Sequence, residues 1–539
     1  MAIPSLAMIP SGYKDGKVYS VLPSNGDGDF TFSRGSSATR VNQDGLIEDV
    51  RQISDVELIT NGGFDTDSDW ALTNASISSG IANISTSGDL AGIVQSSITT
   101  TGKTYKLSID IVSIQTLGDG VSLTSGGLTS AVIHTFTTLG THTVYFTATS
   151  TTIAIKRKSG ATDISIDNVS VKEVISFDVP RLDYSDGSCP SLLLEGQSTN
   201  LLPYSNEFTN AAWSKSSTGI NTSVGTNGIN ENIAISPDGT QNADRVNFNL
   251  QSDLDSGMFD IFAASQNNTY STSVYLKGEG SNIGKKVSIR VKRSSGGAFT
   301  SVDTDYTLTN EWVRLEIYPL TLPSGATNGI IAFSSSEATS CLIYGAQIEE
   351  QSHSTSYIPT NGAVATRLAD ECNSAGNAST FNDSEGVLMV ETSALANDGT
   401  FRTIAINGTP TNVNEDRIQI YFRTDANIIN FGMESGDSAQ FFLQFPLDVK
   451  SNNKLALKYS ASSCSFWING FEVGEELNKV MPTGLSRLDF NLQNGGDNFY
   501  GKTKQVQYFN TALTDIEIEE LSSWSSFLEM AEGQQYKIK

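Results

Sequence analysis

The segment KLALKYSASSCSFWINGFEV, residues 454–473, indicates the fold class of this chain. Leu455, Leu457 and Tyr459 alternate with Ala and Lys, and a period of two places the three side chains on one face of a strand. An Asn-Gly pair then separates two further strand-like stretches. This pair favours a two-residue turn in which both residues take positive φ. The segment therefore predicts antiparallel strands that bury one face.

The same alternation recurs along the chain between segments rich in Ser, Thr, Asn and Gly, and Gly alone accounts for 47 residues. Helical periodicity is confined to residues 513–524, where Thr514 is a candidate N-cap followed by acidic residues that suit the first turn. The pattern therefore predicts an all-β protein. The clearest strands are expected at residues 103–112, 141–149, 286–292 and 417–424.

A weak internal repeat divides the chain, which at 539 residues is too long for one core. ELITNGGFDTDSDW (57–70) is similar to NLLPYSNEFTNAAW (200–213), and each segment closes on a Trp. Two related sandwiches follow, and a polar connector precedes a third unit. The expected organisation is an N-terminal segment (1–55), sandwich one (56–175), a connector (176–199), sandwich two (200–368) and a C-terminal sandwich (369–539).

Composition excludes several classes of function. There are 34 Lys and Arg against 59 Asp and Glu, a net charge of −25, so nucleic acid would be repelled. No apolar run approaches the ~18 residues needed to span a bilayer, so we expect no membrane insertion. The start of the chain lacks the features of a secretory leader. Four scattered Cys and three His suggest neither a zinc site nor a disulfide framework.

Two sets of motifs resemble known β-sandwich families. NGGFDTDSDW with ISIDNVSV, and NEFTNAAW with YGAQIEE, resemble carbohydrate-binding jelly rolls of the kind attached to xylanases and found in phage tail proteins. LALKYSASSCSFWINGFEVG and VQYFNTALTDIEIEEL resemble a concanavalin A-like, laminin-G-like sandwich. The resemblance implies tandem antiparallel β-sandwiches: two jelly rolls and one concanavalin-like domain.

The connectors carry a further resemblance. Residues 30–50 and 180–205 are similar to segments of structural proteins of tailed bacteriophages. The tripeptide ATR ends at Arg40 and again at Arg367. These two guanidinium groups either bind carboxylates at a domain or subunit junction or are solvated in a strand.

Sugar-binding modules need aromatic faces with hydrogen-bonding groups beside them. Trp70 and Trp213 occupy equivalent repeat positions, where core packing is the simpler interpretation. Trp312 falls on the strand face opposite its apolar neighbours, so we expect it to be exposed. Trp467 and Tyr421 are expected to form a sugar platform on an outer face; the alternative is that this face is covered.

Calcium is the second ligand considered. The jelly-roll resemblance implies a structural calcium that ties the first strand region to an acidic residue of the last strand. Asp65 and Asp167 match these two positions. An EF-hand is excluded because Trp70 stands where that loop needs Gly. No other cofactor is required by the sequence.

The sequence offers no catalytic residue. The third unit lacks the pair of close carboxylates of a retaining glycosidase, and no GxSxG motif occurs. The phage resemblance implies a virion structural protein, such as a tail-fibre subunit, that adheres to bacterial surface polysaccharide. It also implies a homotrimer that contacts other virion proteins through residues 1–55. The alternatives are a purely architectural virion subunit and an accessory region of an extracellular glycosidase.

Overall fold

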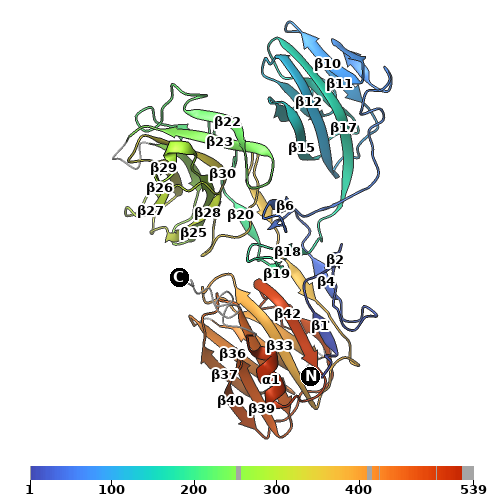
Figure 1. Cartoon of the computed structure of the whole chain (residues 1–539), viewed down its shortest axis with the longest axis vertical. Coiled ribbons are helices and arrows are strands. Elements are labelled where there is room, and N and C mark those ends of the chain that lie inside the picture. Colours follow the sequence, from blue (N-terminus) through green and yellow to red (C-terminus); the bar gives the residue numbers. More distant parts are fainter. Residues whose placement is uncertain (1, 251–256, 409–415, 424, 493, 525–539) are drawn as a thin grey trace. The chain divides into compact units, whose positions relative to one another are not determined.

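The computed structural model describes residues 2–250, 257–408, 416–423, 425–492 and 494–524. Contacts divide the chain into two compact units, Arg51–Phe177 and Met1–Val50 with Asp178–Lys539. Strands dominate the described residues, which confirms the all-β prediction (Figure 1). No helix in those ranges is long and apolar enough to cross a membrane.

The unit Arg51–Phe177 is a β-sandwich that contains the predicted first sandwich. Its core joins side chains of both sheets, among them Ile109 and Ile155, both fully buried. In strand order, the first sheet comprises β15 (Gly140–Thr147), β12 (Thr104–Thr116), β17 (Thr162–Ser176), β10 (Ile81–Thr86) and β9 (Ala75–Ser78), with β7 (Gln52–Ile53) paired to β17. The second comprises β14 (Val132–Phe136), β13 (Val121–Ser125), β16 (Ile153–Arg157), β11 (Gly92–Gln95) and β8 (Ala71–Thr73).

The second sandwich has the same strand order as the first. One sheet comprises β28 (Val313–Thr321), β25 (Thr269–Lys277), β30 (Thr339–Glu349), β23 (Gln241–Phe248) and β22 (Ile229–Ile235). The other comprises β27 (Ser301–Thr307), β26 (Lys286–Ser295), β29 (Asn328–Ser334), β24 (Met258–Ala263) and β21 (Ser214–Lys215), and one 3-10 turn follows β25 at Gly280–Asn282. Strands β8–β17 therefore correspond one to one with β21–β30, which confirms the internal repeat.

The repeated tryptophans have a common structural role. Trp70 is 8% exposed and Trp213 is 1% exposed. The indole nitrogen of each donates to the carbonyl oxygen nine residues earlier, at 3.1 Å to Asn61 and 2.8 Å to Tyr204. Both rings belong to the sandwich cores, as the sequence predicted.

The C-terminal sandwich includes strands from much earlier in the chain. One sheet has the order β18 (Arg181–Asp183), β19 (Ser191–Leu194), β42 (Gly501–Phe509), β33 (Glu385–Ala394), β38 (Asn453–Ser460), β39 (Ser463–Ile468) and β40 (Phe471–Leu477), with β1 (Leu6–Met8) paired to β42. The facing sheet has the order β37 (Ser438–Pro446), β36 (Ile428–Ser435), β35 (Arg417–Phe422), β34 (Arg402–Gly408) and β41 (Leu485–Asp489). Asn469 and Gly470 take φ of 50° and 86°, so the predicted turn is confirmed.

Helix α1 (Asp515–Ser522) begins at the predicted N-cap. Thr514 accepts a hydrogen bond from the backbone of Glu517, whose side chain accepts one in return, so the two form a capping box. Ile518 of the helix is fully buried. Ile518 packs with Val387, Trp467 and Phe509 on the outer face of the sheet that contains β33 and β42. Figure 1 shows α1 against that sheet.

The first fifty residues are not a separate arm in this structure, because they pair with distant segments. β2 (Tyr13–Lys14), β3 (Lys17–Val18) and β4 (Phe30–Ser33) extend to β32 (Glu371–Asn373), and Phe30 and Phe32 join the core of the C-terminal sandwich. A hairpin follows, formed by β5 (Thr39–Val41) and β6 (Ile47–Asp49). A separate pair, β20 (Ser198–Asn200) with β31 (Ala365–Arg367), brackets the second sandwich.

A buried cluster of charges joins these connectors. Arg181 donates to both Glu195 and Asp370, and Arg34 reaches the other oxygen of Asp370 at 3.2 Å. Arg367 lies 3.5 Å from Glu195. All five side chains are at most 4% exposed. Arg367 therefore binds a carboxylate at a junction, the first of the two roles considered for it.

Arg40 does not belong to that cluster. Its guanidinium group pairs with Glu48 across the β5–β6 hairpin at 3.1 Å and lies 5.2 Å from the ring centre of Tyr13. The repeated ATR motif thus places its two arginines in different surroundings.

Candidate functional site

Strand β25 of the second sandwich presents two polar side chains on the outer face of its sheet. Val274 and Leu276 are fully buried in the core, so the alternate residues Tyr275 and Lys277 point away from it. Tyr275 pairs with Arg314 of β28, which places Trp312 at the same edge of this face. Ile317 of the same stretch is buried in the core, whereas Trp312, which we expected to be exposed, is half-buried and lines the outer face beside Tyr275.

The β5–β6 hairpin lies over this part of the sheet. The backbone nitrogen of Ile47 donates to the carbonyl oxygen of Pro237 at 2.8 Å. The Leu46 side chain lies against Gly239, where an added Cβ would come within 3.0 Å of it. Both contacts join residues almost 200 positions apart, and they turn an open sheet face into a walled cavity.

The cavity has a volume of about 330 Å³. Its walls are residues 41 and 45–47 of the hairpin, residues 235–237, and the side chains of Tyr275, Lys277 and Trp312. It therefore combines two aromatic rings with a cationic group in a space within the usual range for small-ligand sites.

Each of the three side chains is half-buried. The indole nitrogen of Trp312 donates to the carbonyl oxygen of Ile235 at 3.0 Å, which fixes the ring. By contrast, no hydrogen bond or ion pair to any described residue holds the Tyr275 hydroxyl or the Lys277 ammonium group. Burial raises the pKa of Tyr275, although nearby Arg314 opposes the shift, so the phenol stays a hydrogen-bond donor at neutral pH. Two polar groups are thus left to bind a ligand.

The structure separates the other two predicted sugar-binding residues. Trp467 is on β39 and Tyr421 is on β35, strands of opposite sheets. Trp467 is only 5% exposed, because helix α1 covers it through Ile518. The expected shared platform is therefore wrong, and the alternative of a covered face holds for Trp467.

Tyr421 lies among aromatic and amide side chains of its own sheet. It is 8% exposed and stacks on Phe401 with ring centres 6.3 Å apart. The paired residue on β36 is Asn430, which is fully buried and whose amide has no hydrogen-bond partner among the described residues. Tyr421 offers little surface to a sugar in this conformation.

The two predicted calcium ligands have different surroundings. Asp65 is exposed, and Asp167 accepts a hydrogen bond from the backbone nitrogen of Asn168 at 2.7 Å. In the described ranges, no three His, Cys, Asp or Glu side chains are grouped so that they could hold a metal ion. The calcium site stays a prediction.

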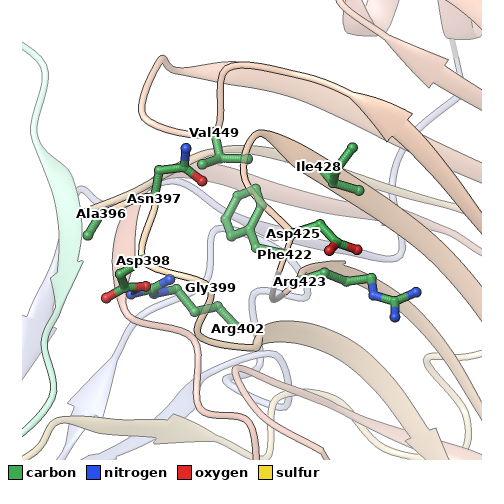
Figure 2. A pocket seen from close by; sticks show the side chains of 10 residues that line it. All are labelled: Ala396, Asn397, Asp398, Gly399, Arg402, Phe422, Arg423, Asp425, Ile428 and Val449. Carbon is green, nitrogen blue, oxygen red and sulfur yellow. Dashed lines mark hydrogen bonds and ion pairs between the residues drawn. The ribbon is translucent and has the colours of Figure 1, made fainter. Parts of the chain in front are cut away.

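A second hollow lies at one end of the C-terminal sandwich (Figure 2). Phe422 lies between the Asp398–Arg402 ion pair and Arg423 in this view. The hollow spans about 170 Å³, none of which admits a sphere the size of a water molecule. We therefore place the candidate site at Trp312.

Sequence reasoning identified Trp312 but missed its neighbours. Tyr275 and Lys277 alternate with apolar residues in STSVYLKG, so the same period-two argument could have placed them on the outer face. Nothing local in the sequence indicates that the hairpin of residues 39–49 covers this face.

No protein-family model and no curated protein sequence matches the chain. Among solved structures, the chain is similar to the CBM40 of Ruminococcus gnavus IT-sialidase bound to α2,3-sialyllactose. This match has 15% identity and a TM-score of 0.24, and it covers 28% of this chain and 94% of that one. A leech intramolecular trans-sialidase matches with 15% identity and a TM-score of 0.25, covering 29% of this chain and 27% of that one. The NanB sialidase of Streptococcus pneumoniae matches with 17% identity and a TM-score of 0.23, covering 27% and 25%. Likeness at this level carries no argument about the ligand of this chain.

Proposed function

We propose that this protein is a glycan-binding structural subunit of a bacteriophage virion appendage. The observation that supports it best is the cavity of about 330 Å³ between the second sandwich and the β5–β6 hairpin. The resemblance of residues 30–50 and 180–205 to phage structural proteins supports the part of the proposal that concerns the virion.

The cavity suits a sugar for chemical reasons. Trp312 and Tyr275 line it with aromatic surface, which favours contact with the C–H groups of a pyranose ring. The Tyr275 hydroxyl and the Lys277 ammonium group add hydrogen-bonding capacity that no described residue uses. Several copies acting together would raise the avidity of adhesion above the affinity of one site.

The remaining parts of the proposal follow from the sequence resemblance. The protein acts on the assembled virion as a homotrimer, binds bacterial surface polysaccharide, and contacts other virion proteins through its first 55 residues. It performs no catalysis and requires no cofactor, and a structural calcium ion in the first sandwich belongs to the same proposal.

The test is binding of the purified full-length protein to an array of bacterial surface polysaccharides, with and without calcium. Trp312→Ala should weaken binding at least tenfold. Tyr318→Ala is the matched control, because Tyr318 lies on β28, the strand that directly follows Trp312, is 83% exposed and does not line the cavity. Equal binding by wild type and Trp312→Ala would contradict a site at the cavity.

An architectural role without sugar binding is the second candidate, and the buried charges support it. The cluster around Arg181 ties three connectors together, which suits a subunit whose modules must hold fixed positions in a particle. No binding to any polysaccharide by the folded protein, with retained assembly into particles, would favour this candidate.

A further inference from the structure

We propose that the cavity beside Trp312 selects an acidic saccharide, and that Lys277 pairs with the sugar carboxylate. This inference rests on the proposed function and adds the chemical class of the ligand. It is carried by the position of Lys277 in the cavity wall and by the absence of any partner for its ammonium group among the described residues.

The surroundings of Lys277 differ from those of three lysines of the C-terminal sandwich, Lys502, Lys458 and Lys479. Lys502 lies 2.7 Å from Asp186, Lys458 lies 2.9 Å from Asp515, and Lys479 lies 2.7 Å from Glu476. The chain holds 59 acidic against 34 basic residues, so carboxylates are abundant. Lys277 nevertheless faces the cavity without one within ion-pair distance in the described structure.

The acidic group on the adjoining loop is already occupied. Asp238 accepts hydrogen bonds from the side chains of Ser236, Thr240, Asn242 and Tyr344, at 2.7 to 2.9 Å. The backbone nitrogen of Thr240 also donates to Asp238 at 2.8 Å, and a carboxylate held by five donors is poorly placed to neutralise Lys277 as well. The positive charge in the cavity wall is therefore available to a ligand.

Because Lys277 is half-buried, its ammonium group contributes more binding free energy to an acidic sugar than to a neutral one. A neutral sugar in the cavity would displace water from the ammonium group and offer only hydroxyl oxygens in return. A carboxylate would form a charge-assisted hydrogen bond, roughly twice as strong as a neutral one. The same pocket therefore discriminates between acidic and neutral forms of one sugar.

The spacing along β25 supports recognition of a single sugar ring. Tyr275 and Lys277 are two residues apart on one strand face, about 7 Å along the strand. A pyranose whose ring lies against Trp312 can direct its carboxylate to Lys277 and a ring hydroxyl to Tyr275. This arrangement uses the three half-buried side chains together.

The experiment uses bacterial capsular polysaccharides that contain uronic acids, each printed in native form and in a carboxyl-reduced form that converts the carboxylate to a primary alcohol. The full-length wild type should bind native forms at least tenfold more tightly than reduced forms. Lys277→Met should abolish that preference by weakening binding to the native forms at least tenfold. Lys286→Met, on β26 of the opposite sheet, is the control and should keep the preference.

Wild-type protein that binds both forms equally, or Lys277→Met protein that keeps the preference, would overturn the inference while leaving glycan binding intact. Absence of binding to every polysaccharide would overturn the proposed function and this inference with it. The melting temperature of Lys277→Met should equal that of wild type, because the residue has no partner in the described structure to lose.

Discussion

Arg181 and Asp370 form a fully buried ion pair between residues 189 positions apart in the chain. Burial lowers the pKa of neighbouring Arg34 to about 10 although Asp370 opposes the shift. Burial alone would raise the pKa of Glu195, but Arg181 and Arg367 overcome it and hold that pKa well below its ordinary value. The cluster contains three cations and two anions, so each carboxylate is needed to keep the arginines buried.

Asp370→Asn should therefore be strongly destabilising. It removes one of two anions and leaves three buried guanidinium groups beside a single carboxylate, a change that costs about 3–5 kcal/mol of folding free energy. Chemical denaturation of the full-length protein measures the loss. Asp303→Asn is the control: it breaks the more exposed pair with Arg290 and should cost no more than about 1 kcal/mol. Equal effects would show that the cluster adds no special stability.

Two buried asparagines on one sheet should respond to the same substitution with opposite signs. Asn430 and Asn407 are both 0% exposed. Asn430 has no hydrogen-bond partner among the described residues, whereas Asn407 donates to Asp489 at 2.7 Å. Asn430→Leu should raise stability by about 1–3 kcal/mol, because it removes an unpaired buried amide. Asn407→Leu should lower it by a similar amount, because the buried Asp489 loses one of its hydrogen-bond donors. Thermal melting of both variants checks the signs, and destabilisation by Asn430→Leu would indicate that the amide binds water or a ligand.

The first sandwich should lose stability in mild acid. Burial lowers the pKa of His134 from 6.5 to about 4, and the neighbouring His142 lowers it further. A group with a lowered pKa takes up its proton more readily when the chain unfolds. The stability that depends on neutral His134 is therefore fully present above about pH 6.5 and is lost as the pH falls from that value to about 4. The loss should be about 1–2 kcal/mol, discounted for the partial exposure of the ring. Calorimetry of the full-length protein from pH 7 to 4 should show a shallower decline for His134→Gln. An unchanged slope in that variant would assign the acid sensitivity to other groups.

Local sequence pattern predicts the features of this fold that depend on neighbours in the chain. The period-two alternation places Trp467 and Phe466 on opposite faces, and the structure agrees: Phe466 is in the core between the sheets and Trp467 is outside it. The Trp70 and Trp213 repeat likewise predicts two cores, because each indole is held by a hydrogen bond to a carbonyl oxygen only nine residues earlier in the chain.

Features that depend on distant segments escape such reasoning. Alternation shows which face Trp467 occupies but not that α1 covers it. The ATR repeat points to Arg367 but not to Arg181. No local sequence pattern distinguishes Arg181, yet it donates to both carboxylates of the buried cluster. The Trp312 cavity needs the β5–β6 hairpin as its second wall, and only the folded chain brings the two together.

Helix α1, which covers Trp467, should depend on its capping box for stability. Thr514→Ala removes the side-chain oxygen that accepts from the backbone of Glu517, at a cost of about 1 kcal/mol. Since about 1.4 kcal/mol is a tenfold change in an equilibrium, amides of residues 513–524 should exchange roughly fivefold faster in hydrogen-exchange mass spectrometry. Glu519→Gln alters the same exposed helix without touching the cap and is the matched control. Equal exchange in Thr514→Ala and wild type would mean that packing of Ile518 on Trp467, rather than the cap, holds the helix in place.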